Sequence, residues 1–416
     1  MPQALGISRS FPRKRESRFH IGMDPPVKPE MTKRYLAACY EEYHQLTWNI
    51  RMGNSLRILI LAPIKRPILA DTTVSRNRVI VDLVTGLIAG GHRITIMGTG
   101  DSSLPNAEII PIVPTSLNFL PPSENPFYQH TAYLTTMISE ALKRQGDFDI
   151  IHNHMYPEYL AFLALNSFDT PMVTTVHSQM TAETIMALKE FPKACLVAIS
   201  EESKRVSGLS MTVVYNSVDT DFFVPIENPT RDYMLFVGRM SKARDENGNF
   251  LDPKGVGHAI KVAQRLGENL KIVGNVEDRE FYETLVKPHL SDKITFVGEV
   301  SSEQKIKREE MRSLFQNAGV LINPINWQEP FGLVMAEALS CRTPVAAFKR
   351  GSVPEIVEDG KTGYVVEPEK GEEGLALAIR NIGNIDRKAC REAAVAKFSK
   401  KRMVSDYEKV YLQLLR

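Results

Sequence analysis

The sequence predicts an α/β protein built from two Rossmann-like domains, each a parallel sheet flanked by helices, which face each other across a cleft. From residue 56 onward, short apolar runs alternate with helical patterns, and this alternation is typical of parallel sheets. The alternation stops in a polar segment with two prolines at 216–232 and then begins again, which indicates a hinge between two similar halves. Ligands bind such domains beside the carboxyl ends of the strands, so the cleft is where we expect a site.

The first domain is expected over residues 52–215. A helix is predicted at 74–90, where Gly90 and Gly91 give a stop signal, and Ser200 is well placed to cap the helix that follows it. The predicted strands are short runs rich in apolar and β-branched residues, at 57–63, 93–98, 149–154, 171–177, 195–200 and 212–216.

The second domain is expected over residues 216–395, and a C-terminal helix at 396–416 is expected to pack back toward the first domain. The run from Phe331 to Leu339 predicts a buried helix. The predicted strands of this domain lie at 233–239, 270–274, 294–300, 319–325, 343–348 and 363–366.

Residues 1–51 differ from the rest of the chain. They carry nine Lys and Arg against five Asp and Glu, are rich in proline, and lack the apolar core of a signal peptide. A disordered extension is the main prediction for them. A regulatory arm and a translation start at Met52 remain as alternatives.

Composition excludes several classes of protein. The net charge is only +2, without the basic stripe of a nucleic-acid binder, and no uncharged apolar run reaches the length of a membrane span. A peripheral membrane contact stays open. The four cysteines are scattered without metal-site or disulfide spacing, which favours a reducing cytoplasm.

The segment "NPINWQEPFG" at 323–332 follows a predicted strand and opens a helix, so its free N–H groups form an anion site. Glu329 stands where that helix begins, although Glu is a poor N-cap. Glu337 shares a face with Leu333 and Val334, where a carboxylate is costly unless it is paired. Acidic residues hold ribose hydroxyls in dinucleotide folds, and this role would satisfy Glu337.

Charged and polar side chains at other strand ends point to the same cleft. Arg239 ends the first strand of the second domain and Lys254 begins a helix, and two cations beside a helix N-terminus suit a diphosphate. His177 ends a strand of the first domain, with His152 and His154 as alternatives. Three His without convergent carboxylates do not make a metal site, and the D-x-D pairs at 147–149 and 219–221 are weak evidence, so no metal is predicted.

With these residues assembled, the chain resembles the family-4 retaining glycosyltransferases of the GT-B fold, over roughly residues 56–416. The resemblance rests on several long motifs in the right order: "GHRITIMGTGDS", "TTVHS", "VAIS", "VYNSVDTDFF", "FVGRM…PKG", "EPFGLVMAE" and "TPVAAFKRGSVPEIVEDGKTGYVV".

The resemblance implies a donor site and a reaction. Glu337 would bind the ribose of a UDP-, GDP- or ADP-sugar. Arg239 and Lys254 would clamp its diphosphate, helped by the backbone N–H groups of Phe331, Gly332 and Leu333. The nucleotide sugar is a co-substrate, and no cofactor or metal is implied.

The implied catalytic residues are Glu329, beside the hydroxyls of the transferred sugar, and His177, near the reacting carbon on the other face. Transfer would retain the anomeric configuration, and the departing diphosphate would help deprotonate the acceptor. The acceptor, whether a glycan, a lipid-linked molecule or a small molecule, would contact variable loops such as 100–130.

Three departures from the family pattern stand out. The loop 62–73 lacks the usual glycine pair, so Lys65 or Arg66 would have to substitute or the loop serves otherwise. The segment between Arg239 and Lys254 looks like an inserted turn, and the role of Lys254 requires that it loop out. "YNS" at 215–217 replaces the common "YNG".

Other functions share this fold class. A GT-B phosphorylase or an epimerase would use the same cleft, and a non-catalytic two-lobed sugar-binding protein is a weaker alternative. A nicotinamide-dependent oxidoreductase would need G-x-G-x-x-G after a first strand, and neither first strand is followed by it.

Overall fold

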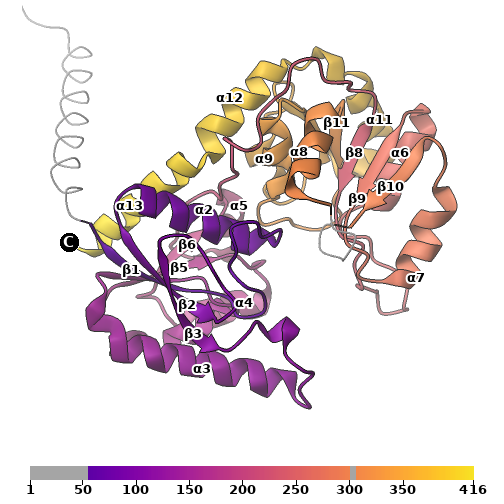
Figure 1. The fold of residues 1–416 in the computed structure, drawn as a ribbon. Coiled ribbons are helices and arrows are strands. Elements are labelled where there is room, and N and C mark those ends of the chain that lie inside the picture. The colour runs from indigo at the N-terminus through magenta and orange to yellow at the C-terminus, as the bar shows by residue number, and fades with distance from the viewer. Residues whose placement is uncertain (1–54, 300–305) are drawn as a thin grey trace, which may run out of the picture. The chain divides into compact units, whose positions relative to one another are not determined.

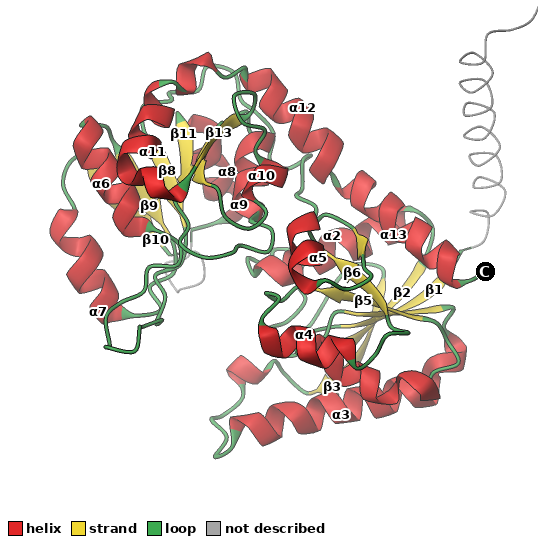
Figure 2. Cartoon of the chain, turned by 180° about the vertical axis from the view of Figure 1, so that it is seen from behind, coloured by secondary structure: helices red, strands yellow, loops and turns green. Residues whose placement is uncertain are grey.

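The computed structural model describes residues 55–299 and 306–416, and the extension predicted at 1–51 lies outside the described residues. Two parallel sheets with helices on their faces form the framework of these residues, as predicted (Figures 1 and 2). By their contacts, residues Ser55–Arg416 belong to one unit, so side chains from both sheets can meet at one place.

The first sheet has seven described strands in the order β3-β2-β1-β4-β5-β6-β7, all parallel. The strand order reverses between β1 and β4, which is where a doubly wound sheet opens a crevice. The strands are β1 (Arg57–Leu61), β2 (Arg93–Thr99), β3 (Ala107–Val113), β4 (Ile150–Asn153), β5 (Met172–Val176), β6 (Cys195–Ala198) and β7 (Thr212–Val213).

The edge strand β3 was not among the predicted strands, and it lies inside the segment 100–130 that was expected to be loop. It carries Glu108 and Pro111 and is only partly buried, so it lacks the apolar signal of the central strands. An edge strand tolerates proline because one side of its backbone has no partner strand.

The helices of the first domain follow the predicted order. Helix α2 (Ser75–Ala89) ends at Gly90, and the Ser200 side chain accepts a hydrogen bond from the Ser203 N–H at the start of α5 (Glu201–Ser207), so both predicted signals are confirmed. The remaining helices are α3 (Pro126–Arg144), α4 (Ala182–Lys189) and three short 3₁₀ segments, Leu117–Phe119, Gln145–Asp147 and Glu158–Ser167.

The second sheet has six described strands in the order β10-β9-β8-β11-β12-β13, again parallel, with its reversal between β8 and β11. The strands are β8 (Met234–Val237), β9 (Leu270–Val273), β10 (Ile294–Gly298), β11 (Val320–Asn323), β12 (Val345–Phe348) and β13 (Gly363–Val366). The α-helices are α6 (Val256–Leu266), α7 (Arg279–Phe281), α8 (Arg308–Asn317), α9 (Leu333–Ser340), α10 (Val353–Ile356), α11 (Gly371–Arg380) and α12 (Arg387–Phe398).

The last helix, α13 (Lys400–Leu414), runs beside α2 of the first domain (Figures 1 and 2). The Tyr411 hydroxyl hydrogen-bonds His152 Nδ1 at 2.8 Å, and the Tyr407 hydroxyl bonds Thr175 at 2.8 Å. The chain therefore passes between the domains twice, once in the linker after β7 and once between α12 and α13. The two crossings touch, because the Val218 N–H donates to the Phe398 carbonyl at 2.8 Å.

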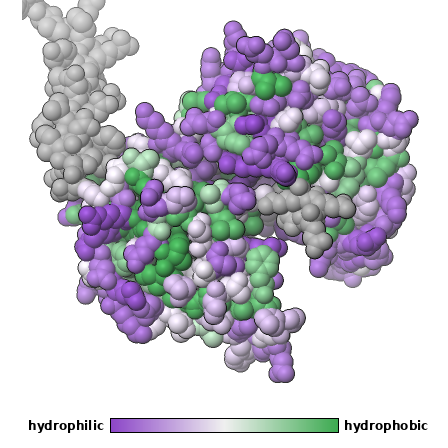
Figure 3. All heavy atoms as spheres, in the orientation of Figure 1, coloured by the Kyte–Doolittle hydropathy of each residue, from purple (hydrophilic) through white to green (hydrophobic). Residues whose placement is uncertain are grey.

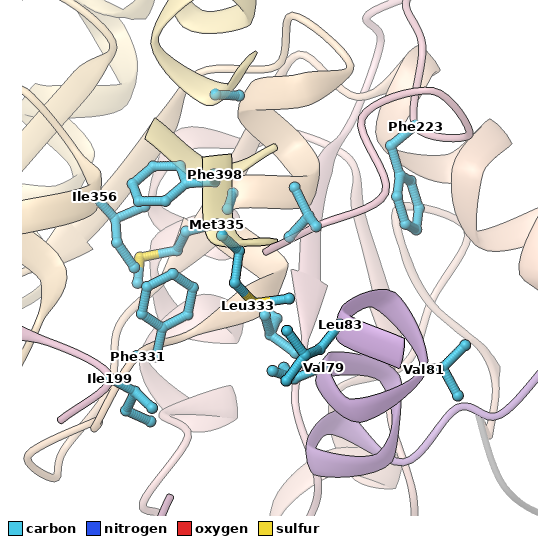
Figure 4. Packing of buried hydrophobic residues seen from close by; sticks show 14 of the residues in the cluster. Val79, Val81, Leu83, Ile199, Phe223, Phe331, Leu333, Met335, Ile356 and Phe398 are labelled. Carbon is cyan, nitrogen blue, oxygen red and sulfur yellow. The ribbon is translucent and has the colours of Figure 1, made fainter. Parts of the chain in front are cut away.

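The apolar faces of α2 and α9 belong to the same cluster of buried residues. Val79 and Leu83 of α2 and Leu333 and Met335 of α9 are members of it (Figure 4). Apolar contact therefore holds α2 of the first domain against α9 of the second domain. This packing places the polar residues of α2 opposite those of α9.

Asp82, on the buried side of α2, is expected to make the stability of the protein depend on pH. Its side chain accepts a hydrogen bond from Ser217 Oγ at 3.1 Å, and burial raises its pKa to about 6. A carboxyl whose pKa is raised on folding stabilises the protein at low pH, and this contribution is lost as the pH rises through 6. Asp82→Asn is therefore expected to raise the free energy of unfolding by about 1–3 kcal/mol at pH 8 and to change it little at pH 4. Thermal unfolding at the two pH values measures this, and an equal change at both would contradict it.

Hydrophilic side chains cover much of the face in Figure 3, and hydrophobic ones lie in separate patches. Within residues 55–299 and 306–416, no helix is both long and apolar enough to cross a bilayer.

Candidate functional site

A pocket of about 370 Å³ lies at the carboxyl ends of β8, β9 and β11, beside the reversal of the second sheet. This is the place where a doubly wound sheet binds ligands. The second domain supplies most of the lining, including Gly238, Arg239, Lys254, Gly274, Asn323, Trp327, Glu329, Gly332, Leu333 and Glu337; the first domain adds Thr72, Thr73, Ser75 and Arg78.

Helix α9 begins at the pocket without a side-chain cap. Its N-cap is Gly332, in the left-handed conformation at φ 90°, and Leu333 is its first residue. The open N-terminus and the helix dipole make this position suitable for an anion. The helix was predicted at 331–339 and is observed at 333–340; the Phe331 side chain itself is buried against Phe398, with ring centroids 5.6 Å apart.

Glu337 is almost fully buried, and its partner comes from the other domain. Arg78 Nη1 of α2 lies 2.6 Å from Glu337 Oε1, and the two side chains are 22% and 4% exposed. The ion pair offsets the free-energy cost of burying a carboxylate on an apolar helix face. It also holds the carboxylate at the wall of the pocket, where a hydroxyl donor could reach it.

Glu329 lies in the loop before α9 and meets two donors. Its Oε2 accepts from the Lys254 ammonium and from Trp327 Nε1, the latter at 3.0 Å. The ammonium also sits over the Trp327 ring, 4.9 Å from the centroid. Cation–π contact and the ion pair together fix the Lys254 ammonium at the pocket wall.

Lys254 reaches the pocket because the segment before it loops out. Within that segment, Arg244 pairs with Asp278 and Glu280, and Asp252 accepts from the N–H groups of Gly255 and Gly257 at 2.8 Å. Gly255 has φ 80°, and a Cβ there would lie 1.8 Å from the Pro324 carbonyl oxygen. The chain needs glycine to approach β11 this closely.

Arg239 follows β8 and lines the same pocket. Its side chain is half exposed and lies 3.5 Å from Glu277, a loose contact. It is therefore able to move toward an anion in the pocket at little cost.

His177 lies at the end of β5 and outside the set of residues that line this pocket. Its Nε2 hydrogen-bonds His154 Nδ1 at 2.8 Å, and its backbone N–H donates to Glu158 Oε1. Burial holds the pKa of His177 and of His154 well below the ordinary value, so both rings are neutral at pH 7. The catalytic role of His177 stays a prediction.

The glycine-poor loop contributes threonines rather than its cations to the pocket. Thr72 and Thr73 line it, whereas Arg66 lines a neighbouring hollow and stacks on Phe119, 5.5 Å from the ring centroid. Lys65 lies 5.6 Å from the centroid of the Tyr156 ring.

The structure thus brings together Glu329, Glu337, Lys254, Arg239 and the start of α9, and it leaves His177 apart. Sequence reasoning missed Arg78 and Trp327. A signal for Arg78 was present, because a cation in the first turn of a helix opposes the dipole and requires an acidic partner from elsewhere. Trp327 gave no signal of its own beyond its place in the loop.

Two doubly wound domains with a site at the strand ends of the second define the GT-B fold class. The same architecture occurs in sucrose-phosphate synthase from Thermosynechococcus elongatus, with a TM-score of 0.69, 20% identity, and 86% of this chain and 99% of that one covered. It also occurs in the Anabaena protein HepE in complex with UDP and glucose, with a TM-score of 0.62, 16% identity, and 85% and 99% covered.

Sequence comparison gives the family. The model "Glycosyl transferases group 1" matches residues 217–396, and "Glycosyltransferase Family 4" matches residues 77–222. Among curated relatives, a glycogen synthase of Mycobacterium tuberculosis is 26% identical over 377 residues, which covers 78% of this chain and 86% of the relative. The chain belongs to the family-4 glycosyltransferases.

Proposed function

We propose that this glycosyltransferase moves a sugar from a nucleotide-sugar donor to an acceptor hydroxyl, with retention of the anomeric configuration and without a metal ion. The observation that carries the proposal is the convergence of Glu329, Glu337, Arg239, Lys254 and the N-terminus of α9 on one pocket. These groups are suited to bind the ribose, the diphosphate and the sugar of a nucleotide sugar. The UDP and glucose named for the HepE structure support the same class of ligand.

Each group has a proposed place. Glu337 binds the ribose hydroxyls, and Arg239 and Lys254 bind the diphosphate together with the N–H groups at the start of α9. Glu329 contacts the hydroxyls of the transferred sugar, and the Lys254 ammonium is held between Glu329 and the diphosphate.

The proposed chemistry depends on the leaving group. When the bond between the anomeric carbon and the phosphate oxygen breaks, negative charge develops on the diphosphate, and cations and dipoles already in place stabilise it. The acceptor hydroxyl attacks from the same face and gives its proton to a departing phosphate oxygen. His177 positions the sugar from the first domain, and closure of the domains excludes water that would hydrolyse the donor.

The experiment tests binding and then transfer. Titration calorimetry with UDP, GDP, ADP and NAD is expected to show binding of one nucleoside diphosphate and not of NAD. The sugars linked to that nucleotide are then offered with a panel of acceptors, in the presence of EDTA, and products are detected by mass spectrometry and their anomeric configuration by NMR. No binding of any nucleoside diphosphate would overturn the proposal, and activity that EDTA abolishes would overturn its metal independence.

A further inference from the structure

The ion pair between Arg78 and Glu337 joins the two domains inside the pocket that is proposed to hold the donor. Its atoms are 2.6 Å apart, and the Glu337 side chain is 4% exposed. The two residues come from α2 and α9, whose apolar faces share one buried cluster. The pair therefore joins a buried carboxylate of one domain to a partly exposed guanidinium of the other.

Arg78 owes its position to Glu337 and not to its own helix. It lies in the first turn of α2, which has no side-chain cap and no acidic residue in that turn. A cation there is disfavoured by the helix dipole. Among the described residues, the carboxylate that forms an ion pair with Arg78 is that of Glu337.

A second carboxylate lies within reach of Arg78. Asp82 follows it by four residues on α2, a spacing that brings side chains together on a helix. Asp82 is buried and accepts a hydrogen bond from Ser217 at 3.1 Å. A side pocket of about 190 Å³ is lined by Arg78, Asp82 and Glu337 together, so the guanidinium has room between the two carboxylates.

In the proposed complex, the ribose binds the Glu337 carboxylate that Arg78 contacts, so the two compete for it. The ribose hydroxyls supply the hydrogen bonds that the buried carboxylate needs, and Arg78 then requires a new partner. We propose that the ribose displaces the Arg78 guanidinium from Glu337, and that nucleotide binding moves this guanidinium to Asp82. The nucleotide thereby exchanges a contact between the domains for one within α2. This inference rests on the proposed function.

The test measures dissociation constants by titration calorimetry with the nucleoside diphosphate that the wild-type protein binds. Arg78→Met removes the competitor and is expected to tighten binding by at least about fivefold, the lower end of typical coupling between sites. Arg78→Lys keeps a cation without the guanidinium fork and is expected to tighten binding less. Asp82→Asn removes the second partner and is expected to weaken binding, and it is expected to have no effect when Arg78 is Met.

The matched control is Arg57→Met. Arg57, like Arg78, belongs to the first domain and pairs with a carboxylate, that of Asp149 at 2.9 Å, but it lies outside the residues that line either pocket. Its dissociation constant is expected to equal that of the wild type. Unchanged or weaker binding in Arg78→Met would overturn the competition, and Arg78→Lys tests the same competition if the Met variant does not fold. An unchanged constant in Asp82→Asn would overturn Asp82 as the second partner. Absence of binding in the wild type would instead overturn the proposed function.

Discussion

Glu337→Ala is expected to raise the dissociation constant for the nucleoside diphosphate by roughly 100-fold or more. Glu337 is 3% exposed and lines the pocket, and in the proposed complex it accepts hydrogen bonds from two ribose hydroxyls. A hydrogen bond to a charged group contributes about 1.5–3 kcal/mol, so the loss of two amounts to about 3 kcal/mol or more. Titration calorimetry measures the constant directly.

The control for this change is Glu373→Ala. Glu373 pairs with Arg265 at 2.9 Å on the surface and is 79% exposed, so its removal is expected to leave nucleotide binding unchanged. An unchanged dissociation constant in Glu337→Ala would show that the ribose lies elsewhere. The free base, which lacks ribose, gives a further check, because its affinity is expected to be the same in both proteins.

Lys254→Met is expected to lower kcat by about 10²–10³-fold, the usual effect of removing one group that stabilises developing charge. The ammonium is held by Glu329 and the Trp327 ring, so its position does not depend on the diphosphate. Methionine keeps most of the side-chain volume, and Glu329 keeps its hydrogen bond from Trp327 Nε1 at 3.0 Å. Initial rates at saturating donor measure the effect.

Lys261→Met is the matched control, on the helix that follows Lys254. Lys261 lies 3.2 Å from Glu372 and is 67% exposed, so kcat is expected to stay unchanged. If Lys254→Met raised KM and left kcat as it was, Lys254 would bind ground state and transition state equally, and its role in leaving-group departure would be wrong.

Much of the fold was predictable because its signals are local. Central strands such as β1 and β11 are continuous apolar runs, and α5 begins where Ser200 caps it. The strand β3 escaped prediction for the opposite reason. At the sheet edge it is only partly buried, and Pro111 breaks the pattern that marks a strand.

The candidate site was predictable only in part. Glu337 was found because a carboxylate on an apolar helix face requires a partner, and the sequence of that helix alone is enough to show this requirement. Arg78 was not predicted as a partner of Glu337, because the two residues meet only through the tertiary packing of α2 on α9. Lys254 reaches the pocket because the segment before it loops out and because Gly255 allows close approach to Pro324. Only the three-dimensional structure shows these two features.

The paired crossings between the domains restrict how those domains can move. The linker and the start of α13 run together where the Val218 N–H meets the Phe398 carbonyl. Two adjacent connections between the domains define an axis. Rotation of one domain about that axis strains neither connection, whereas twisting or sliding of the domain strains both. We therefore expect a rotation of one sheet relative to the other to take place about this axis.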